Sequence, residues 1–183
     1  MLTDEQLVAA SLQGSDGAFG ELVERYQGRL LRFLLTRANS RADAEDAIQD
    51  TFINAYRYLG SYDPRWRFST WLYRIAIRNA ARQRRPEWHD ANVELVDDAD
   101  PLDACIAESE RENVWVTAKR LLSDDAFEAM WLRYVEDLSV REIARALDKS
   151  SSWTKVTLLR GRRKLSEEMA EAGGVPATSE SYG

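Results

Sequence analysis

Apolar residues return at intervals of three and four along almost the whole chain, which is the spacing of one face of an α-helix. Only nine Gly and four Pro interrupt the 183 residues, and three of the prolines fall where the apolar pattern breaks. The pattern therefore predicts an all-α fold. Its clearest run is a stripe formed by Phe19, Leu22, Val23, Tyr26, Leu30, Phe33 and Leu34.

Start and stop signals divide this pattern into segments. Ser40 with Asp43 three residues later is typical of a helix start, and Gly14, Gly60 and Pro64 are typical of helix ends. Ser139 with Glu142 three residues later forms a full capping box. We expect helices over residues 2–12, 19–34, 41–59, 69–85, about 106–122, 123–135, 140–147 and 151–170.

Positive charge is concentrated between Asp63 and Glu87, a stretch that contains no acid. Arginine binds phosphate and aromatic rings stack on unpaired bases, so the stretch predicts a surface for single-stranded or melting nucleic acid. The alternative is an amphipathic helix with a solvated basic face. The stretch interleaves seven arginines, Arg65, Arg67, Arg74, Arg78, Arg82, Arg84 and Arg85, with the aromatic residues Trp66, Phe68, Trp71 and Tyr73.

The position of each aromatic residue decides what it can do. We expect Trp66 and Phe68 to precede the helix in a loop, where a ring can reach a base. Trp71 and Tyr73 fall in the first turns of the helix, and core packing is the alternative role for Trp71. Separating base pairs costs a few kcal/mol, and each base that stacks on a ring returns roughly 1–3 kcal/mol.

The segment after the arginines has the opposite charge. It shows no useful periodicity, which is typical of a linker with little order. Residues 86–110 hold nine acids and no Lys or Arg: Glu87, Asp90, Glu94, Asp97, Asp98, Asp100, Asp103, Glu108 and Glu110. We expect two small helical domains, at residues 1–86 and 109–170. An acidic flexible linker at 87–108 would join them, and a disordered tail at 171–183 would follow.

The expected helix over 41–59 carries acids on one side. This side has three interpretations: a solvated helix face, a two-metal nuclease site, and a docking surface for a basic partner protein. The nuclease needs further ligands from other elements, and no histidine accompanies the acids. The residues concerned are Asp43, Glu45, Asp46, Gln49 and Asp50.

A short helix over 140–147, a turn near Asp148, and a longer basic helix form the layout of a helix-turn-helix, although the usual turn glycine is missing. The first residues of the second helix would enter the DNA major groove, and its later basic residues would hold phosphates or face solvent. The first group is Ser151, Ser152, Trp153, Thr154 and Lys155, and the second is Arg160, Arg162, Arg163 and Lys164.

Composition excludes several other classes. Cys105 is the only cysteine and His89 the only histidine, so neither an intrachain disulfide nor a zinc site is expected, and we expect no cofactor. No run approaches the roughly 18 apolar residues of a membrane span, and the acidic N-terminus lacks a secretory signal. The chain is therefore expected in the cytoplasm without membrane insertion. The pI near 5.0 argues against a histone-like DNA coat.

Together these stretches resemble the bacterial RNA polymerase sigma factors of the extracytoplasmic function (ECF) group, within the sigma-70 family. The likeness reaches to about residue 168, with the motifs in the expected order. It is carried by GAFGELVERYQGRLLRFL (17–34), RADAEDAIQDTFINAYRYL (41–59), RFSTWLYRIAIRNAARQRR (67–85), LSVREIARAL (138–147) and RGRRKL (160–165).

The resemblance implies a non-enzymatic initiation factor. Its acidic helix would dock on the clamp helices of the largest polymerase subunit, and its C-terminal domain would read the minus-35 element and contact the polymerase flap. The acidic linker would thread toward the RNA path, and an anti-sigma factor is the expected restraint. The minus-10 element would be opened and read by Tyr62, Arg65, Trp66, Arg67, Phe68, Trp71, Arg74, Arg78, Asn79 and Arg82.

One departure concerns the recognition helix. The family usually opens this helix with a Gly-Thr-Val-Lys-Ser-Arg run, whereas this chain has Ser152-Trp153-Thr154-Lys155-Val156-Thr157, which keeps only the lysine. Asp148 also replaces the small turn residue, which predicts an altered turn. Two competing functions stay open: a stand-alone helix-turn-helix regulator, which leaves the arginine stretch unexplained, and a nucleic-acid enzyme that uses the carboxylates.

Overall fold

The structure is a computed structural model that describes residues 1–38, 40–83 and 109–172. In these ranges the chain forms helices and no strand, which confirms the all-α prediction. The expected linker over 87–108 lies outside the described residues, as do Arg84 and Arg85. The elements are α1 (Asp4–Leu12), α2 (Asp16–Leu35), α3 (Arg41–Arg57), the 3-10 helix η1 (Leu59–Ser61), α4 (Phe68–Gln83), α5 (Ser109–Leu121), α6 (Asp124–Tyr134), α7 (Val140–Leu147) and α8 (Ser151–Ala172).

Helices α1 to α4 form the N-terminal half around the apolar stripe of α2. Leu22, Leu30 and Phe33 of this stripe are completely buried. The Phe33 ring meets the buried Tyr73 ring of α4 edge-on, with centroids 5.3 Å apart. Small residues of α3, such as Ala44, Ala47 and Ala55, are buried, so α3 packs closely on α2 and α4. The acidic side of α3 is thereby left facing solvent.

Helices α5 to α8 form the C-terminal half. Trp115 of α5 packs against Phe127 and Trp131 of α6, with ring centroids 5.7 and 5.0 Å apart. Helices α7 and α8 pack on α6 and on each other as the predicted helix-turn-helix. Helix α8 continues to Ala172, two residues past its expected end at 170, and the rest of the expected tail lies outside the described residues.

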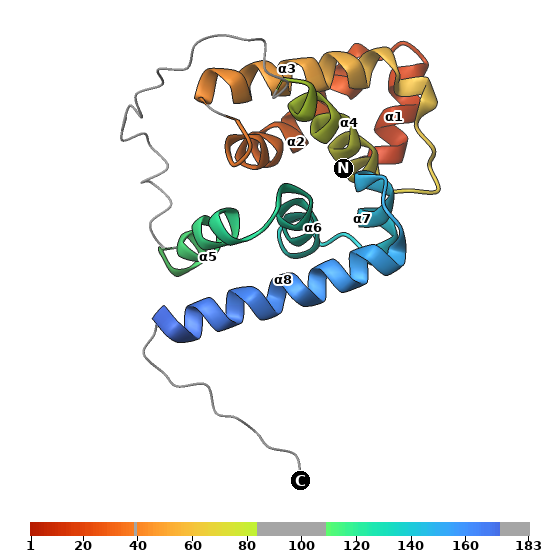
Figure 1. Cartoon of the computed structure of the whole chain (residues 1–183). Helices are drawn as coiled ribbons and strands as arrows, with labels where there is room; N and C mark the ends of the chain where they lie inside the picture. The colour runs from red at the N-terminus through yellow and green to blue at the C-terminus, as the bar shows by residue number, and fades with distance from the viewer. Residues whose placement is uncertain (39, 84–108, 173–183) are drawn as a thin grey trace.

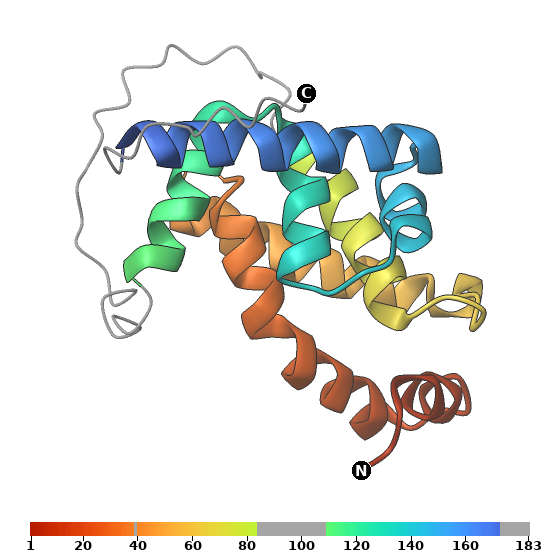
Figure 2. The same cartoon turned by 90° about the horizontal axis from the view of Figure 1, so that it is seen from below.

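The two halves pack against each other. Figure 1 shows α3 and α8 along opposite sides of the molecule, with α2, α4 and α6 between them, and α7 beside α4. Figure 2 shows the same arrangement after a 90° turn, with α8 running across the other helices. Phe33 of α2 also contacts Trp131 of α6, with centroids 6.1 Å apart. The apolar core is therefore continuous between the halves.

The predicted capping box at the start of α7 is confirmed. The Glu142 backbone amide donates to Ser139 Oγ at 3.3 Å, and the Ser139 amide donates to Glu142 Oε2 at 2.8 Å. Ser139→Ala should lower the free energy of unfolding by about 1 kcal/mol, because one amide at the helix start loses its acceptor. Urea denaturation would measure this loss. Ser152→Ala, at an exposed position in α8, is the matched control, and an equal effect of both variants would contradict the capping role.

Candidate nucleic-acid interface

The acidic side of α3 is fully presented to solvent. Asp43, Glu45, Asp46, Gln49 and Asp50 are all exposed, and Ser40 begins the helix by accepting a hydrogen bond from the Asp43 amide at 3.1 Å. Two large apolar side chains farther along the helix, Ile53 and Tyr56, are each 54% exposed. Acids next to exposed apolar side chains suit a protein-docking surface better than a purely solvated face.

The loop between η1 and α4 is a tight turn. The Trp66 amide donates to the Asp63 carbonyl at 3.1 Å, and Arg65 binds the Asp63 carboxylate through Nε and Nη2 at 2.7–3.0 Å. The side-chain hydrogen bonds from Arg65 lower the pKa of Asp63 to about 2, so this carboxylate stays ionised. These contacts hold Trp66 at the tip of a fixed loop.

Tyr62 stabilises the same loop through a hydrogen bond and ring contacts. Its hydroxyl donates to the Trp66 carbonyl oxygen at 2.7 Å, and its ring packs edge-on against Phe68 and Trp71. Burial, followed by the charge of nearby acids, raises the pKa of Tyr62 to about 12. The hydroxyl therefore remains a hydrogen-bond donor at any physiological pH.

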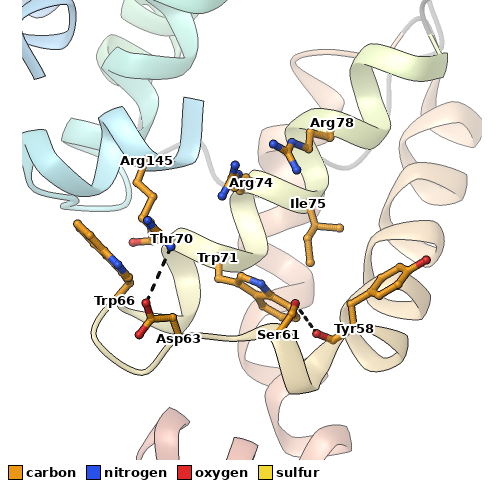
Figure 3. A pocket seen from close by; sticks show the side chains of 10 residues that line it. All are labelled: Tyr58, Ser61, Asp63, Trp66, Thr70, Trp71, Arg74, Ile75, Arg78 and Arg145. Atoms are coloured by element: carbon orange, nitrogen blue, oxygen red, sulfur yellow. Dashed lines mark hydrogen bonds and ion pairs between the residues drawn. The ribbon is translucent and has the colours of Figure 1, made fainter. Parts of the chain in front are cut away.

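A cavity of about 270 Å³ opens beside this loop. Figure 3 shows its lining: Trp66 comes from the loop, a row of side chains comes from α4, and Arg145 reaches in from α7. The volume is near the lower end of the roughly 300–1,000 Å³ that is usual for small-molecule sites. The lining residues with a chemical role are Trp66, Thr70, Trp71, Arg74, Arg78 and Arg145.

Two polar atoms at this cavity lack protein partners. Thr70 is 1% exposed, and its Oγ1 has no hydrogen bond within the described ranges; the same holds for Arg74 Nε. Burial, followed by repulsion from Arg78, lowers the pKa of Arg74. Because buried polar groups in proteins are normally paired, these two atoms mark places where a polar ligand would be stabilised.

The turn between α7 and α8 takes an unusual backbone conformation. Asp148 has φ 58° and ψ 43°, the left-handed region that a turn glycine would adopt freely. Asp is one of the few other residues that tolerate this region. Ser150 then starts α8 by accepting a hydrogen bond from the Trp153 amide at 3.0 Å. The missing glycine therefore leaves the helix-turn-helix intact.

Comparisons with known proteins agree with this geometry. The family described as Sigma-70 region 2 matches residues 22–89, and the family described as Sigma-70, region 4 matches residues 115–165. The ECF RNA polymerase sigma-E factor of Haemophilus influenzae is 34% identical over 92% of this chain and 96% of its own length. The RNA polymerase sigma-H factor of Pseudomonas aeruginosa is 32% identical over 91% of this chain and 93% of its own length.

The chain belongs to the sigma-70 family, in its ECF group. The sigma factor is thus a DNA-binding factor that directs transcription initiation at promoters. Two solved structures share its fold. The structure of CnrH in complex with the cytosolic domain of CnrY has a TM-score of 0.68 and 24% identity, and it covers 92% of this chain and 97% of that chain. The structure of the sigma factor RpoE in complex with the anti-sigma factor NepR from Bartonella quintana has a TM-score of 0.60 and 20% identity, and it covers 82% of this chain and 96% of that chain. Over its described residues, no helix is long and apolar enough to span a bilayer.

The structure brings together part of the minus-10 set predicted for this sigma factor. Trp66, Trp71, Arg74 and Arg78 line one cavity. Trp71 is half-buried and contacts both Tyr62 and Phe68, so part of its ring packs in the fold while the residue also lines the cavity. The exposed arginines Arg65 and Arg67 flank Trp66. Arg82 lies in α4, and its side chain falls outside what the structure describes.

Two members of that set lie in the core. Phe68 is the first residue of α4 rather than a loop residue, and its ring is 1% exposed against Tyr26, so the prediction that it reaches a base is wrong for this conformation. Asn79 faces inward as expected: it donates to Thr51 Oγ1 and accepts from Asn54 Nδ2, both at 3.3 Å. These bonds fix α4 on α3 and leave Asn79 unable to touch DNA.

The recognition helix of the sigma factor needs one correction. Thr154 is completely buried and its hydroxyl donates to the Ser150 carbonyl at 3.0 Å, so it cannot enter the major groove. Trp153 is half-buried, with Lys149 Nζ 5.3 Å from its ring centroid. The remaining predicted minus-35 residues are exposed: Ser151, Ser152, Lys155, Arg160, Arg162 and Arg163.

Thr70 and Arg145 are among the cavity residues that the sequence did not indicate. Thr70 has no distinctive spacing, because a single threonine in an aromatic-rich helix carries no signal of an unpaired hydroxyl. Arg145 lies 79 positions after Trp66, yet its guanidinium carbon is 4.7 Å from the Trp66 ring centroid. Only the packing of the two halves places it there.

Proposed function

We propose that this sigma factor docks on core RNA polymerase through α3 and opens the minus-10 element at the cavity beside Trp66. The observation that carries the proposal is the cavity itself. It combines an aromatic ring on a fixed loop, two α4 arginines, and a buried hydroxyl without a protein partner. An unpaired base needs a stacking surface and hydrogen-bond partners for its edge, and the strand that carries it needs cations.

The acidic surface of α3 supports the polymerase-docking part of the proposal. Its acids are exposed along with Ile53 and Tyr56, and together they offer charge complementarity and apolar contact to a basic helical partner. A nuclease site there lacks support, because no ligands from another element join these acids among the described residues. We propose that the chain, like the sigma-70 family to which it belongs, acts as a non-enzymatic initiation factor, and that it works with the polymerase in the cytoplasm.

The C-terminal helix-turn-helix would read the minus-35 element through the exposed start of α8. Ser151, Ser152 and Lys155 are the candidates for base contacts, and the arginines of α8 are candidates for phosphate contacts. An anti-sigma factor is the proposed restraint, in line with the anti-sigma complex of the RpoE structure that shares this fold. The proposed domain bounds remain 1–86 and 109–170, although α8 reaches Ala172.

Run-off transcription with purified core polymerase tests the proposal. The factor should direct initiation at discrete sites on genomic fragments, and core polymerase alone should not. A gel shift without polymerase provides the contrast, because an acidic protein with charge −6 is repelled by DNA at long range. Tight, sequence-specific duplex binding by the free chain, with no effect on start-site choice, would favour a stand-alone regulator instead.

Thr70→Val tests the cavity separately from the fold. Valine has nearly the same shape, and the lost hydroxyl has no protein partner, so the free energy of unfolding should stay the same or rise slightly. Promoter opening should slow by about three- to ten-fold if a base bonds this hydroxyl. Permanganate footprinting would follow opening, and urea denaturation would follow stability.

Thr51→Val is the matched control for this variant. Thr51 is also buried, but its hydroxyl donates to the Ala47 carbonyl at 2.7 Å and accepts from Asn79 Nδ2 at 3.3 Å. This control should lose about 1–3 kcal/mol of stability, because both bonds are lost and the Asn79 amide is left without this acceptor, with no specific loss of promoter opening. The assignment of Thr70 fails if Thr70→Val opens promoters at the rate of the unmodified factor.

A further inference from the structure

Two large apolar side chains of the recognition helix α8 face solvent. Leu159 is 67% exposed and Val156 is 44% exposed. By contrast, Leu158 and Leu165 of the same helix are buried. Figure 1 shows α8 at the edge of the molecule, where a partner can reach it. Apolar surface that is left in water gains free energy when a partner covers it.

The two side chains lie on the side of α8 opposite the core. Successive residues of an α-helix are about 100° apart around its axis, so residues two positions apart face nearly opposite ways. Val156 lies two positions after the completely buried Thr154. Leu159 lies two positions before Gly161, where a Cβ would come within 3.1 Å of Met130 Sδ. Val156 and Leu159 therefore share the centre of the exposed side, three positions apart.

Basic side chains flank this apolar pair on both sides. Around the helix axis, Lys155 and Arg162 lie on one side of it and Arg160 lies on the other, and all three are exposed. Phosphates line both edges of the DNA major groove, which is wide enough to admit an α-helix. Charge complementarity therefore favours a DNA groove as the partner of this side, with the phosphates on the basic residues and the base pairs on the apolar pair.

The apolar pair suits one chemical group of the base pairs. In the major groove the bases present hydrogen-bond donors, hydrogen-bond acceptors and the C5-methyl group of thymine. An apolar side chain against a donor or acceptor would take it from water without bonding it, which is unfavourable. Val156 also stands where the run usual in the family has a serine, so a hydrogen-bonding side chain is replaced here by one that can only make apolar contacts.

We propose that Val156 and Leu159 select thymines at two neighbouring base pairs of the minus-35 element by packing on their methyl groups. The inference rests on the proposed function, which places the start of α8 in the major groove. The two residues are about 4.5 Å apart along the helix axis, close to the roughly 3.4 Å between successive base pairs. Each side chain would therefore meet a different base pair.

Deoxyuridine tests the methyl group by itself, because uracil pairs as thymine does and lacks only this group. A promoter that the factor uses in run-off transcription would be synthesised with uracil in place of thymine, one position at a time, across the minus-35 element. Gel shifts of the holoenzyme at one fixed salt concentration would compare the affinities. Uracil at two neighbouring base pairs should weaken binding by about three- to five-fold each, and at other thymines by less than about two-fold.

Two variants assign these positions to side chains. Leu159→Ala and Val156→Ala should each bind the thymine promoter about three- to five-fold more weakly. Each should also lose the effect of uracil at its own position only, because the contact is already absent there. Met169→Ala is the matched control, since it removes another exposed apolar side chain farther along α8. This control should keep the full effect of uracil at both positions.

Two results would overturn the inference and leave the proposed function intact. One is a scan in which uracil has no effect at any position of the minus-35 element. The other is a pair of variants that bind more weakly but respond to uracil as the unmodified factor does, which would mean that this side of α8 contacts the polymerase rather than bases. A factor that directs no start site fails the proposed function itself, and the inference falls with it.

Discussion

Asp46→Lys is expected to weaken assembly of the sigma factor with core RNA polymerase by about 100-fold. Asp46 lies at the centre of the exposed acidic face of α3, one turn from Asp43 and from Asp50. A lysine there would face the basic partner surface with like charge, which costs several kcal/mol in a protein interface. Surface plasmon resonance with immobilised core polymerase would measure the affinity directly.

Glu24→Lys provides the control for charge alone. Glu24 is exposed on α2, a different helix from the one that carries the acidic face, and the substitution changes net charge by the same amount. This control should keep nearly full affinity for the polymerase. If Asp46→Lys assembles as well as Glu24→Lys, the docking surface lies elsewhere. Both variants should keep the unfolding free energy of the unmodified chain, because neither side chain is buried.

Trp66→Ala should slow promoter opening by about ten- to a hundred-fold while polymerase binding stays unchanged. Stacking of a base on an aromatic ring is worth roughly 1–3 kcal/mol. Tyr62, the other aromatic residue of the loop over 62–67, packs its ring on Phe68 and Trp71 and so could not replace Trp66. The effect should appear in the opening step rather than in assembly, since Trp66 lies on a different surface from the α3 acids. Permanganate reactivity of promoter thymines would follow opening.

Trp66→Phe tests whether stacking is the cause. A phenyl ring keeps an aromatic face, so this variant should recover most of the lost opening rate. Tyr134→Ala, which removes a half-exposed aromatic ring from α6, should have little effect on opening. A defect of Trp66→Phe as large as that of Trp66→Ala would contradict the stacking role and point to the shape of the loop instead.

Local rules predicted most of the fold from the sequence. The capping box at Ser139 and the start at Ser40 were correct to the residue, because both depend only on side chains within the first helical turn. The apolar stripe of α2 gave the centre of the core, since a 3.6-residue period and burial are directly linked. The end of α3 was predicted less accurately: the helix expected over 41–59 ends at Arg57, and Leu59 starts η1.

The candidate site was less predictable, because burial decides the role of an aromatic or a threonine and burial is a tertiary property. Phe68 and Trp66 are two residues apart and look alike in sequence, yet one ring is buried under the other helices and the other forms the loop tip. Thr154 similarly lies between the exposed Ser152 and Lys155 in the sequence, yet it is completely buried. Arg145 lies at the cavity only because segments distant in the sequence pack together, and no local sequence pattern predicts such packing.

Asp148 shows how one position can serve two needs that conflict. Its left-handed backbone costs about 1–2 kcal/mol for a residue with a Cβ, less for Asp than for most others. Its carboxylate, however, faces two arginines of the other half. A glycine at position 148 would relax the bend and remove that attraction together. The helix-turn-helix would become more stable by itself, and the C-terminal half would lose part of its electrostatic attraction to α4.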